Sequence, residues 1–129
     1  TLATTASEIF KALVEATAFG SRAINERLAD EGLRIDKILA VGGISKKSRF
    51  VMQTMADVIG VRIQVVRSSQ ACALGSAMNA AVAAGLFASV EQAQDAMSSG
   101  FDSEYIPNQE RHQIYNKLYR RYLDAAYGI

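Results

Sequence analysis

Apolar residues recur every three or four positions along the first part of the chain, which is the period of an α-helix with one buried stripe. The stripe comprises Ile9, Leu13, Ala16, Gly20, Ile24 and Leu28. Thr5 and Glu8 have the spacing of a capping box, in which each side chain bonds the backbone of the other residue. Gly32 follows the stripe as a C-terminal stop. The pattern therefore predicts a first helix from Ala6 to Glu31.

The next segment has the pattern of two strands joined by a helix. Ile35–Val41 contains a continuous apolar run that is typical of a strand buried on both faces, and it ends at Gly42-Gly43. Ser48–Ile59 has helical spacing, and Val61–Val66 resumes a strand pattern. A helical crossover joins parallel strands and is right-handed in nearly all proteins. We therefore expect an adjacent parallel strand pair, with the first helix and a later helix over Gln70–Ala84 packed on the sheet.

The following segment predicts two more helices. Ser68 and Ser69 can cap a helix over Gln70–Ala84. This helix has an unusually small-residue face, so we expect it to pack tightly. Ser89–Gln92 has the spacing of a second capping box and opens a short helix to about Ser98.

The last segment predicts a connector and a helix, and adds no third strand. Phe101–Asn108 holds the single proline and is expected to be a connector, after which Asn108 caps a helix over Gln109–Tyr127. Two strands against five helices is an unbalanced count, because an isolated strand pair is only marginally stable. We therefore expect an α/β chain that forms the C-terminal part of a larger lobe, with further strands upstream of Thr1. A compact all-helical domain with one short strand pair is the alternative.

Composition and charge exclude several classes of function. The 129 residues suffice for one domain or a piece of one, and 14 basic against 13 acidic residues give a net charge of +1. This charge creates no field that would attract nucleic acid or an acidic membrane. An apolar content of 50% and a charged content of 21% exclude a mainly disordered chain. The chain starts Thr1-Leu2-Ala3 with no Met and no leader pattern, so we expect an excised piece of a longer protein.

Cysteine usage and apolar run length favour a cytoplasmic setting. Cys72 is the single cysteine and cannot form an internal disulfide. No continuous apolar run approaches the roughly 18 residues that a membrane helix requires. We therefore expect neither a membrane nor an oxidising compartment.

The turn after the first predicted strand is the candidate binding site. Gly42 and Gly43 permit positive φ angles and let a ligand lie against bare backbone, and the first amides of a following helix favour phosphate. Lys46 and Lys47 can add positive charge, and Ser45 lies within the same loop. The candidate nucleotide-binding residues are Gly42, Gly43, Ser45, Lys46 and Lys47. The spacing matches neither common phosphate motif, and a Gly-Gly pair after a strand is often only a turn.

Four other features have structural interpretations. His112 has no metal-ligand partner at a suitable spacing, so we expect a solvated or packed histidine. Cys72 has no base beside it in the sequence and is expected to be a small buried hydrophobe. Asp57 is expected to form a salt bridge, with a water-mediated magnesium contact as the alternative. The tyrosines of the last helix are expected to form a packing stripe.

Three motifs together resemble the C-terminal nucleotide-binding lobe of the FGGY family of carbohydrate kinases. They are the Gly42-Gly43 loop, the Met-Gln-x-Met-Ala-Asp-Val-x-Gly run from Met52 to Gly60, and the Ala-Leu-Gly-Ser-Ala run from Ala73 to Ala77. The similarity extends over nearly the whole chain. Within the family it is greatest to the branch that phosphorylates L-ribulose, because Gln70-Ala71-Cys72-Ala73-Leu74-Gly75 resembles that branch.

The resemblance implies a two-lobed, actin-like ATPase of the ribonuclease H-like fold, with ATP and Mg²⁺ in the cleft. Residues 1–129 would form part of the C-terminal lobe, and the sugar would bind mainly to the absent N-terminal lobe. The glycine pair would lie against the α-phosphate and ribose, and Lys47 would take the position beside adenine. The catalytic aspartate, the N-terminal phosphate loop and most Mg²⁺ ligands have no counterpart in this chain.

ATP or ADP is therefore the expected ligand of this lobe in the complete protein, and the isolated chain is expected not to catalyse transfer. Because its sheet edge and inter-lobe surface would be bare, we also expect it to self-associate. A non-catalytic helical interaction module, in which the Gly-Gly loop is only a turn, is the alternative.

Overall fold

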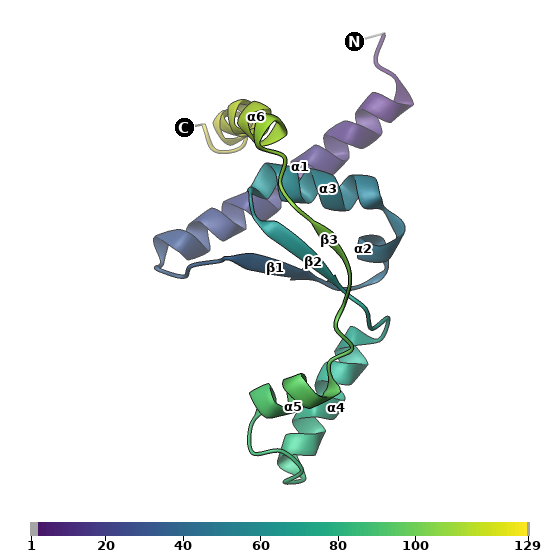
Figure 1. The fold of residues 1–129 in the computed structure, drawn as a ribbon. Helices are drawn as coiled ribbons and strands as arrows, with labels where there is room; N and C mark the ends of the chain where they lie inside the picture. Colours follow the sequence, from purple (N-terminus) through teal and green to yellow (C-terminus); the bar gives the residue numbers. More distant parts are fainter. Residues whose placement is uncertain (1–2, 129) are drawn as a thin grey trace.

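The computed structural model describes residues 3–128, without the side chain of Tyr127 (Figure 1). The expectation of an excised piece was based on the start of the chain at Thr1 and Leu2, and these two residues lie outside the described range. The elements are α1 (Ala6–Asp30), β1 (Lys37–Ala40), α2 (Gly43–Lys47), α3 (Arg49–Ile59), β2 (Arg62–Val66), α4 (Ala71–Ala83), α5 (Val90–Met97), β3 (Phe101–Tyr105) and α6 (Gln109–Tyr127). None of the described helices combines the length and apolarity that a membrane crossing requires.

The described sheet has three strands in the order β1-β2-β3. β1 and β2 are parallel, from Lys37 opposite Arg62 to Ala40 opposite Val65, and α3 lies between them in the chain. The predicted crossover unit is therefore confirmed. The connector expected over Phe101–Asn108 is wrong in its first part, because β3 pairs antiparallel with β2. This strand is held by backbone hydrogen bonds, and its side chains are mostly exposed. Its sequence therefore lacks the apolar alternation that would predict a strand.

Within residues 3–128, one face of the sheet is packed by a helix, α3. Ile63 and Val65 of β2 are buried, and Ile63 packs with Met52 and Ala56 of α3. β1 was expected to be buried on both faces, but its residues alternate between exposed and half-buried, and Leu39 is 49% exposed. This expectation is wrong because the opposite face of the strand has no covering element among the described residues.

α3 is shared between the sheet and a second cluster formed with α1 and α6. Val58 of α3 packs against Ala18 and Phe19 of α1 and Tyr119 of α6. The ring of Phe19 lies 5.4 to 6.2 Å from three α6 tyrosine rings, namely Tyr115, Tyr119 and Tyr122. The tyrosine stripe is therefore a packing surface, as predicted. α1 was expected to pack on the sheet and packs on α3 instead.

α4 and α5 form a helical pair that extends away from the sheet (Figure 1). A cavity of about 470 Å³ lies between this pair and the outer face of β1 and β2. Met78 is the one buried residue of α4, so the expectation of tight packing is wrong. Cys72, expected to be buried, is exposed on the same helix. Small side chains permit close approach, but α5 is the described helix that packs on α4, and it leaves most of the small side chains half-buried or exposed.

The helix caps agree with the sequence in most places. Thr5 and Glu8 form the predicted capping box, and Asn108 caps α6 by accepting a bond from the Arg111 amide. Ser89 accepts from the Gln92 amide, although the Gln92 side chain bonds to Ala88 N–H instead of closing the box. α4 begins after Gln70 with no side-chain cap. The predicted serine cap of α4 is therefore wrong.

The α1 stripe was expected to be buried, and this expectation is wrong, because the face of α1 that packs carries Val14, Ala18 and Phe19 instead. One apolar surface therefore has no cover within the described chain. It consists of the α1 residues Ile9, Phe10, Leu13, Ile24 and Leu28, which are 37 to 64% exposed. Phe10 makes a ring contact with the exposed Phe50 at 6.2 Å, so this surface continues from α1 onto the start of α3. An exposed apolar surface of this kind marks a contact with another part of a protein or with a partner.

The C-terminal glycine of α3 combines two constraints. Gly60 has φ of +79°, and a Cβ built on it would lie 2.6 Å from Cε1 of His112. The His112 ring is held in place because its Nδ1 is 2.8 Å from the carbonyl oxygen of Asp57. Any side chain at position 60 must therefore adopt a left-handed conformation and also displace this ring.

We predict that Gly60→Ala destabilises the fold by about 3 kcal/mol, because the left-handed cost of roughly 1 to 2 kcal/mol adds to the displacement of His112. Gly85→Ala is the matched control, since Gly85 has φ of +76° and no atom within 4 Å of the built Cβ. It should cost only the left-handed term. Denaturant unfolding measures both, and in a His112→Ala background the two costs should become equal. Equal costs in the native background would contradict the steric argument.

Candidate functional site

The Gly42-Gly43 loop lies at the carboxyl end of β1. In open sheets with parallel strands, ligands bind outside this edge. Gly42 has φ of +93°, as expected for a turn glycine, whereas Gly43 begins α2 with no positive φ. Of the two glycines, Gly42 alone uses the positive φ that this residue type permits.

The helix after the loop differs from the sequence prediction. A five-residue helix, α2, stands before α3, and Ser48 caps α3 by accepting a bond from the Val51 amide at 3.3 Å. The first turn of α3 therefore uses a side-chain cap where free amides were expected. α2 is too short for its peptide dipoles to sum to a large field. The loop thus offers glycine backbone to a ligand rather than the end of a long helix.

Two of the candidate side chains bond within the chain. Ser45 is 2% exposed and its Oγ donates a 2.7 Å hydrogen bond to the carbonyl oxygen of Gly42. The ammonium of Lys46 donates to the carbonyl oxygen of Arg67, beyond the end of β2. Lys47 is exposed at the end of α2. Ser45 and Lys46 therefore shape the loop, and Lys47 faces solvent.

The glycines leave an open surface. A Cβ built on Gly42 or on Gly43 meets no heavy atom within 4 Å. Gly43 thus has neither a close neighbour nor a positive φ that would require glycine. What its missing side chain does provide is bare backbone that an external group can approach.

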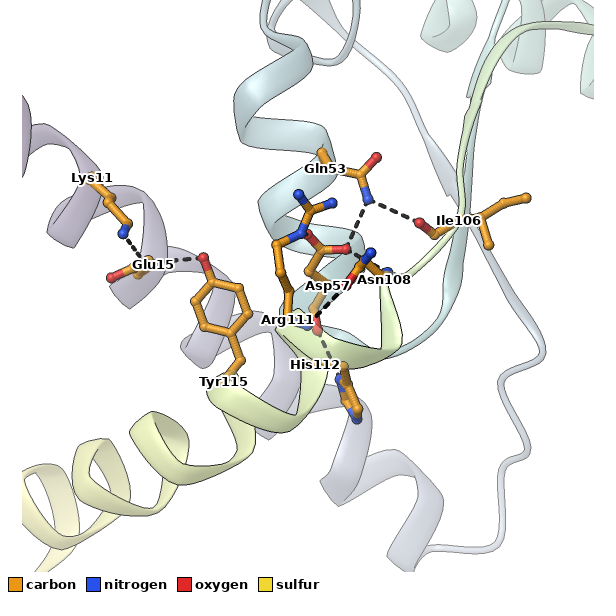
Figure 2. Close-up of polar contacts among 9 residues, drawn as sticks. All are labelled: Lys11, Glu15, Gln53, Asp57, Ile106, Asn108, Arg111, His112 and Tyr115. Atoms are coloured by element: carbon orange, nitrogen blue, oxygen red, sulfur yellow. Dashed lines mark hydrogen bonds and ion pairs between the residues drawn. The ribbon is translucent and has the colours of Figure 1, made fainter.

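A buried carboxylate joins α3 to α6 (Figure 2). Asp57 is 2% exposed, and its Oδ1 accepts hydrogen bonds from Gln53 Nε2 and from the Asn108 amide, both at 2.8 Å. Its Oδ2 pairs with Arg111 Nε at 2.7 Å. The predicted salt bridge is confirmed, and both oxygens are engaged by protein donors. Within residues 3–128, no group of three or more histidine, cysteine or acidic side chains is placed to hold a metal ion.

The aromatic and basic side chains around α6 are also structural. His112 is packed, as expected, beside the Asp57 carbonyl. The Tyr115 hydroxyl donates a 3.1 Å hydrogen bond to Glu15 Oε1 of α1 (Figure 2). Burial, and next the negative charge of Glu15, raise the pKa of Tyr115 to about 12.

Sequence reasoning missed Arg22, which holds the three helices together. Its Nη1 donates to Asn116 Oδ1 at 2.6 Å and to the Val58 carbonyl at 3.2 Å. Its guanidinium carbon lies 4.3 Å from the centre of the Tyr119 ring. The available signal was its spacing of four from Glu26, with which it pairs at 2.8 Å. That spacing predicts only a surface pair, and the partners on α3 and α6 are set by the fold.

We predict that Asp57→Ala lowers the unfolding free energy by about 2 to 4 kcal/mol, because it removes a buried acceptor of two hydrogen bonds and one ion pair. The Asn108 amide loses its acceptor, whereas Gln53 keeps its bond to the Ile106 carbonyl. Asp36→Ala is the matched control, since the exposed Asp36 pairs with Arg34 at 2.8 Å. It should change stability by less than about 1 kcal/mol. Denaturant unfolding of both variants measures the difference, and similar values would contradict the role of burial.

Stability should also fall between about pH 10 and pH 12. Tyr115 keeps its proton in the folded state up to a pKa of about 12, against 10.0 for its ordinary value. The folded state therefore holds more protons in this window, so stability decreases as the pH rises. Tyr115→Phe removes this group and should reduce the slope of unfolding free energy against pH. Part of the slope should remain, because burial also raises the pKa of Tyr119. An unchanged slope in the variant would contradict the assignment.

Comparison with known proteins supplies relatives along the whole chain. Ribulokinase of Vibrio parahaemolyticus is 41% identical over 125 residues, covering 97% of this chain and 22% of the relative. Ribulokinase of Bacillus licheniformis is 43% identical over 126 residues, covering 95% of this chain and 23% of the relative. The chain therefore spans less than a quarter of the length of these curated relatives.

Solved structures share the fold. Ligand-bound xylulose kinase of Lactobacillus acidophilus has a TM-score of 0.79 at 27% identity, over 99% of this chain and 27% of the kinase. Glycerol kinase of Plasmodium falciparum, crystallised with ADP, has a TM-score of 0.77 over 98% of this chain and 26% of that chain. Its 21% identity supports the shared fold alone.

A family model gives the same assignment. The model of the C-terminal domain of the FGGY family of carbohydrate kinases matches residues 1–84, which include α1, the glycine loop and all of α4. This match covers well over half of the chain. The chain therefore belongs to the FGGY family of carbohydrate kinases, and it carries sequence of that family's C-terminal domain.

Proposed function

We propose that residues 1–129 form part of the C-terminal nucleotide-binding lobe of a two-lobed sugar kinase. The complete protein transfers the γ-phosphoryl group of ATP to a sugar hydroxyl. L-ribulose is the proposed acceptor, because the ribulokinases of two bacteria are 41 and 43% identical over nearly the whole chain. The sugar binds mainly to the other lobe, and the protein works in the cytoplasm.

The observation that carries this proposal is the open glycine pair at the carboxyl edge of β1 in a chain of this family. Gly42 and Gly43 receive the α-phosphate and ribose on bare backbone, and the exposed stem of Lys47 covers the edge of the adenine. Ser45 and Lys46 hold the loop in shape through bonds to the carbonyls of Gly42 and Arg67. The site thus relies on backbone shape rather than on a helix end.

This chain supplies one wall of the reaction site. Phosphoryl transfer requires the acceptor, a base, Mg²⁺ and the phosphates to be held in line. Mg²⁺ neutralises phosphate charge in such reactions, and its ligands lie mainly outside this chain. The buried Asp57 is engaged with Arg111 and takes no part. We therefore expect the isolated chain to bind nucleotide without catalysing transfer.

The uncovered surfaces support a larger lobe. The exposed α1 residues and Leu39 on the outer face of β1 are apolar, and the kinases that resemble this chain are about four times as long. In the complete protein we expect the rest of the polypeptide to cover these surfaces. Self-association of the isolated chain, through the same surfaces, stays a prediction.

Gly43→Val tests the nucleotide assignment in the complete kinase. The substitution places a β-branched side chain where the nucleotide is proposed to contact the protein backbone. ADP affinity should therefore fall about tenfold to a hundredfold. Folding should be preserved, because no protein atom lies within 4 Å of the built Cβ. Calorimetric titration with ADP and with L-ribulose measures the effect, and sugar affinity should stay unchanged.

Gly75→Val is the matched control, since Gly75 is also helical and also has no atom within 4 Å of its built Cβ. It should leave ADP affinity unchanged. Normal ADP affinity in folded Gly43→Val would make the glycine pair only a turn. The chain would then fit the alternative of a helical interaction module without a nucleotide site.

A further inference from the structure

One lysine ties the glycine loop to the neighbouring strand. Lys46 is the fourth residue of α2, and its ammonium donates to the carbonyl oxygen of Arg67, the residue after β2. The carboxyl ends of β1 and β2 lie at the same edge of the sheet because the strands are parallel. The side chain therefore crosses from the loop after one strand to the end of the next.

Arg67 carries the connection further along the same edge. Its amide donates to the Gly100 carbonyl at 3.0 Å, and its Nη2 donates to the Phe101 carbonyl at 3.1 Å. The α4–α5 pair leaves the sheet after Arg67 and returns at Gly100, so this residue closes the base of that pair. Lys46 thus fastens the loop to a point that is itself held from two sides.

The near side of the loop has its own fastening. The buried Ser45 hydroxyl donates to the Gly42 carbonyl within the turn. This bond fixes the turn internally but leaves its position relative to β2 open. The hydrogen bond from the Lys46 ammonium to the Arg67 carbonyl links α2 to the end of β2 and so sets the position of the loop relative to that strand.

We propose that Lys46 is a positioning residue, which holds the glycine loop in register with the end of β2 for nucleotide binding. This inference rests on the proposed function. A site made of backbone groups needs its loop placed within tenths of an ångström, since backbone amides cannot adjust as long side chains do. The competing role for an exposed lysine beside a phosphate site is direct contact with a phosphate.

The two roles differ in what their loss does. Without a positioning bond the whole loop is displaced, so AMP, ADP and ATP should all lose affinity by the same factor. If Lys46 instead contacts a phosphate, its loss should weaken the binding of ADP and ATP more than that of AMP. The dependence of nucleotide affinity on salt should also become weaker, because one ionic contact is gone. A positioning residue leaves the salt dependence unchanged.

The test uses the complete kinase with Lys46→Met, which keeps the apolar stem and removes the donor. We expect AMP and ADP affinity to fall by the same factor, about three- to tenfold, as for loss of one hydrogen bond. KM for ATP should rise by a similar factor while kcat stays within about twofold, because binding is lost equally in the ground and transition states. Hydrogen exchange of the amides at positions 42–48 should become faster.

Two further variants complete the comparison. Lys46→Arg retains a donor that reaches the carbonyl and should restore most of the affinity. Lys117→Met removes the same charge from the exposed surface of α6 and should change nothing. Circular dichroism confirms that each variant is folded.

The outcomes distinguish the positioning role of Lys46 from the proposed nucleotide-binding function on which it rests. If the native kinase binds no ADP, the proposed function fails. If it binds ADP and Lys46→Met binds equally well, only the positioning role fails. A loss that is larger for ADP than for AMP, or that comes with a weaker salt dependence, would make Lys46 a phosphate ligand and overturn the inference.

Discussion

The structure depends on burying α3 from two sides at once. One side of this helix meets the sheet through Met52 and Ala56, and another meets α1 and α6 through Val58. The constraint begins with topology, because two adjacent parallel strands need a crossover and α3 is that crossover. Its burial makes the whole arrangement cooperative. Full burial of side chains such as Val58 or Ile63 stabilises the fold by about 1.5 to 3 kcal/mol each.

Polar interactions then set where the outer helices lie on α3. Hydrophobic contact alone is non-directional, so α6 could dock in several registers. Asp57 of α3 and Arg22 of α1 restrict this choice. Asp57 accepts a hydrogen bond from the Asn108 amide at the start of α6, and Arg22 donates one to Asn116 within α6. Both are satisfied by partners distant in sequence. They specify the packing more than they add to its strength, because a buried charge repays its desolvation only with well-placed partners.

The glycine loop lies at the end of this scaffold and is held differently. Its residues bury little apart from Ser45, and single hydrogen bonds through Ser45 and Lys46 fix its position. Segments with few buried contacts are the first to open locally. A loop of this kind suits the nucleotide site that we propose, since tight packing against Gly42 and Gly43 would fill the space that the ligand requires. The exposed apolar residues of α1 and Leu39 of β1 have a different explanation, since we propose that the rest of a longer polypeptide covers them.

The sequence by itself determined the elements whose stability is local or whose faces meet a core. Thr5, Asn108 and the apolar stripes marked their helices correctly, and the run before Gly42 marked a parallel strand, because caps and periodicity act over a few residues. The Gly-Gly loop and the Met52–Gly60 run are enough, as sequence alone, to indicate the family.

Only the tertiary structure decided which faces are covered and which side chains meet. β3 has an exposed polar sequence and exists because β2 offers a free edge. Leu39 and Cys72 are exposed because no described element lies over them, although their types suggested burial. Arg22, Asp57 and Lys46 found partners 94, 51 and 21 positions away. No local pattern encodes such contacts, since they arise from the way in which separately formed elements pack.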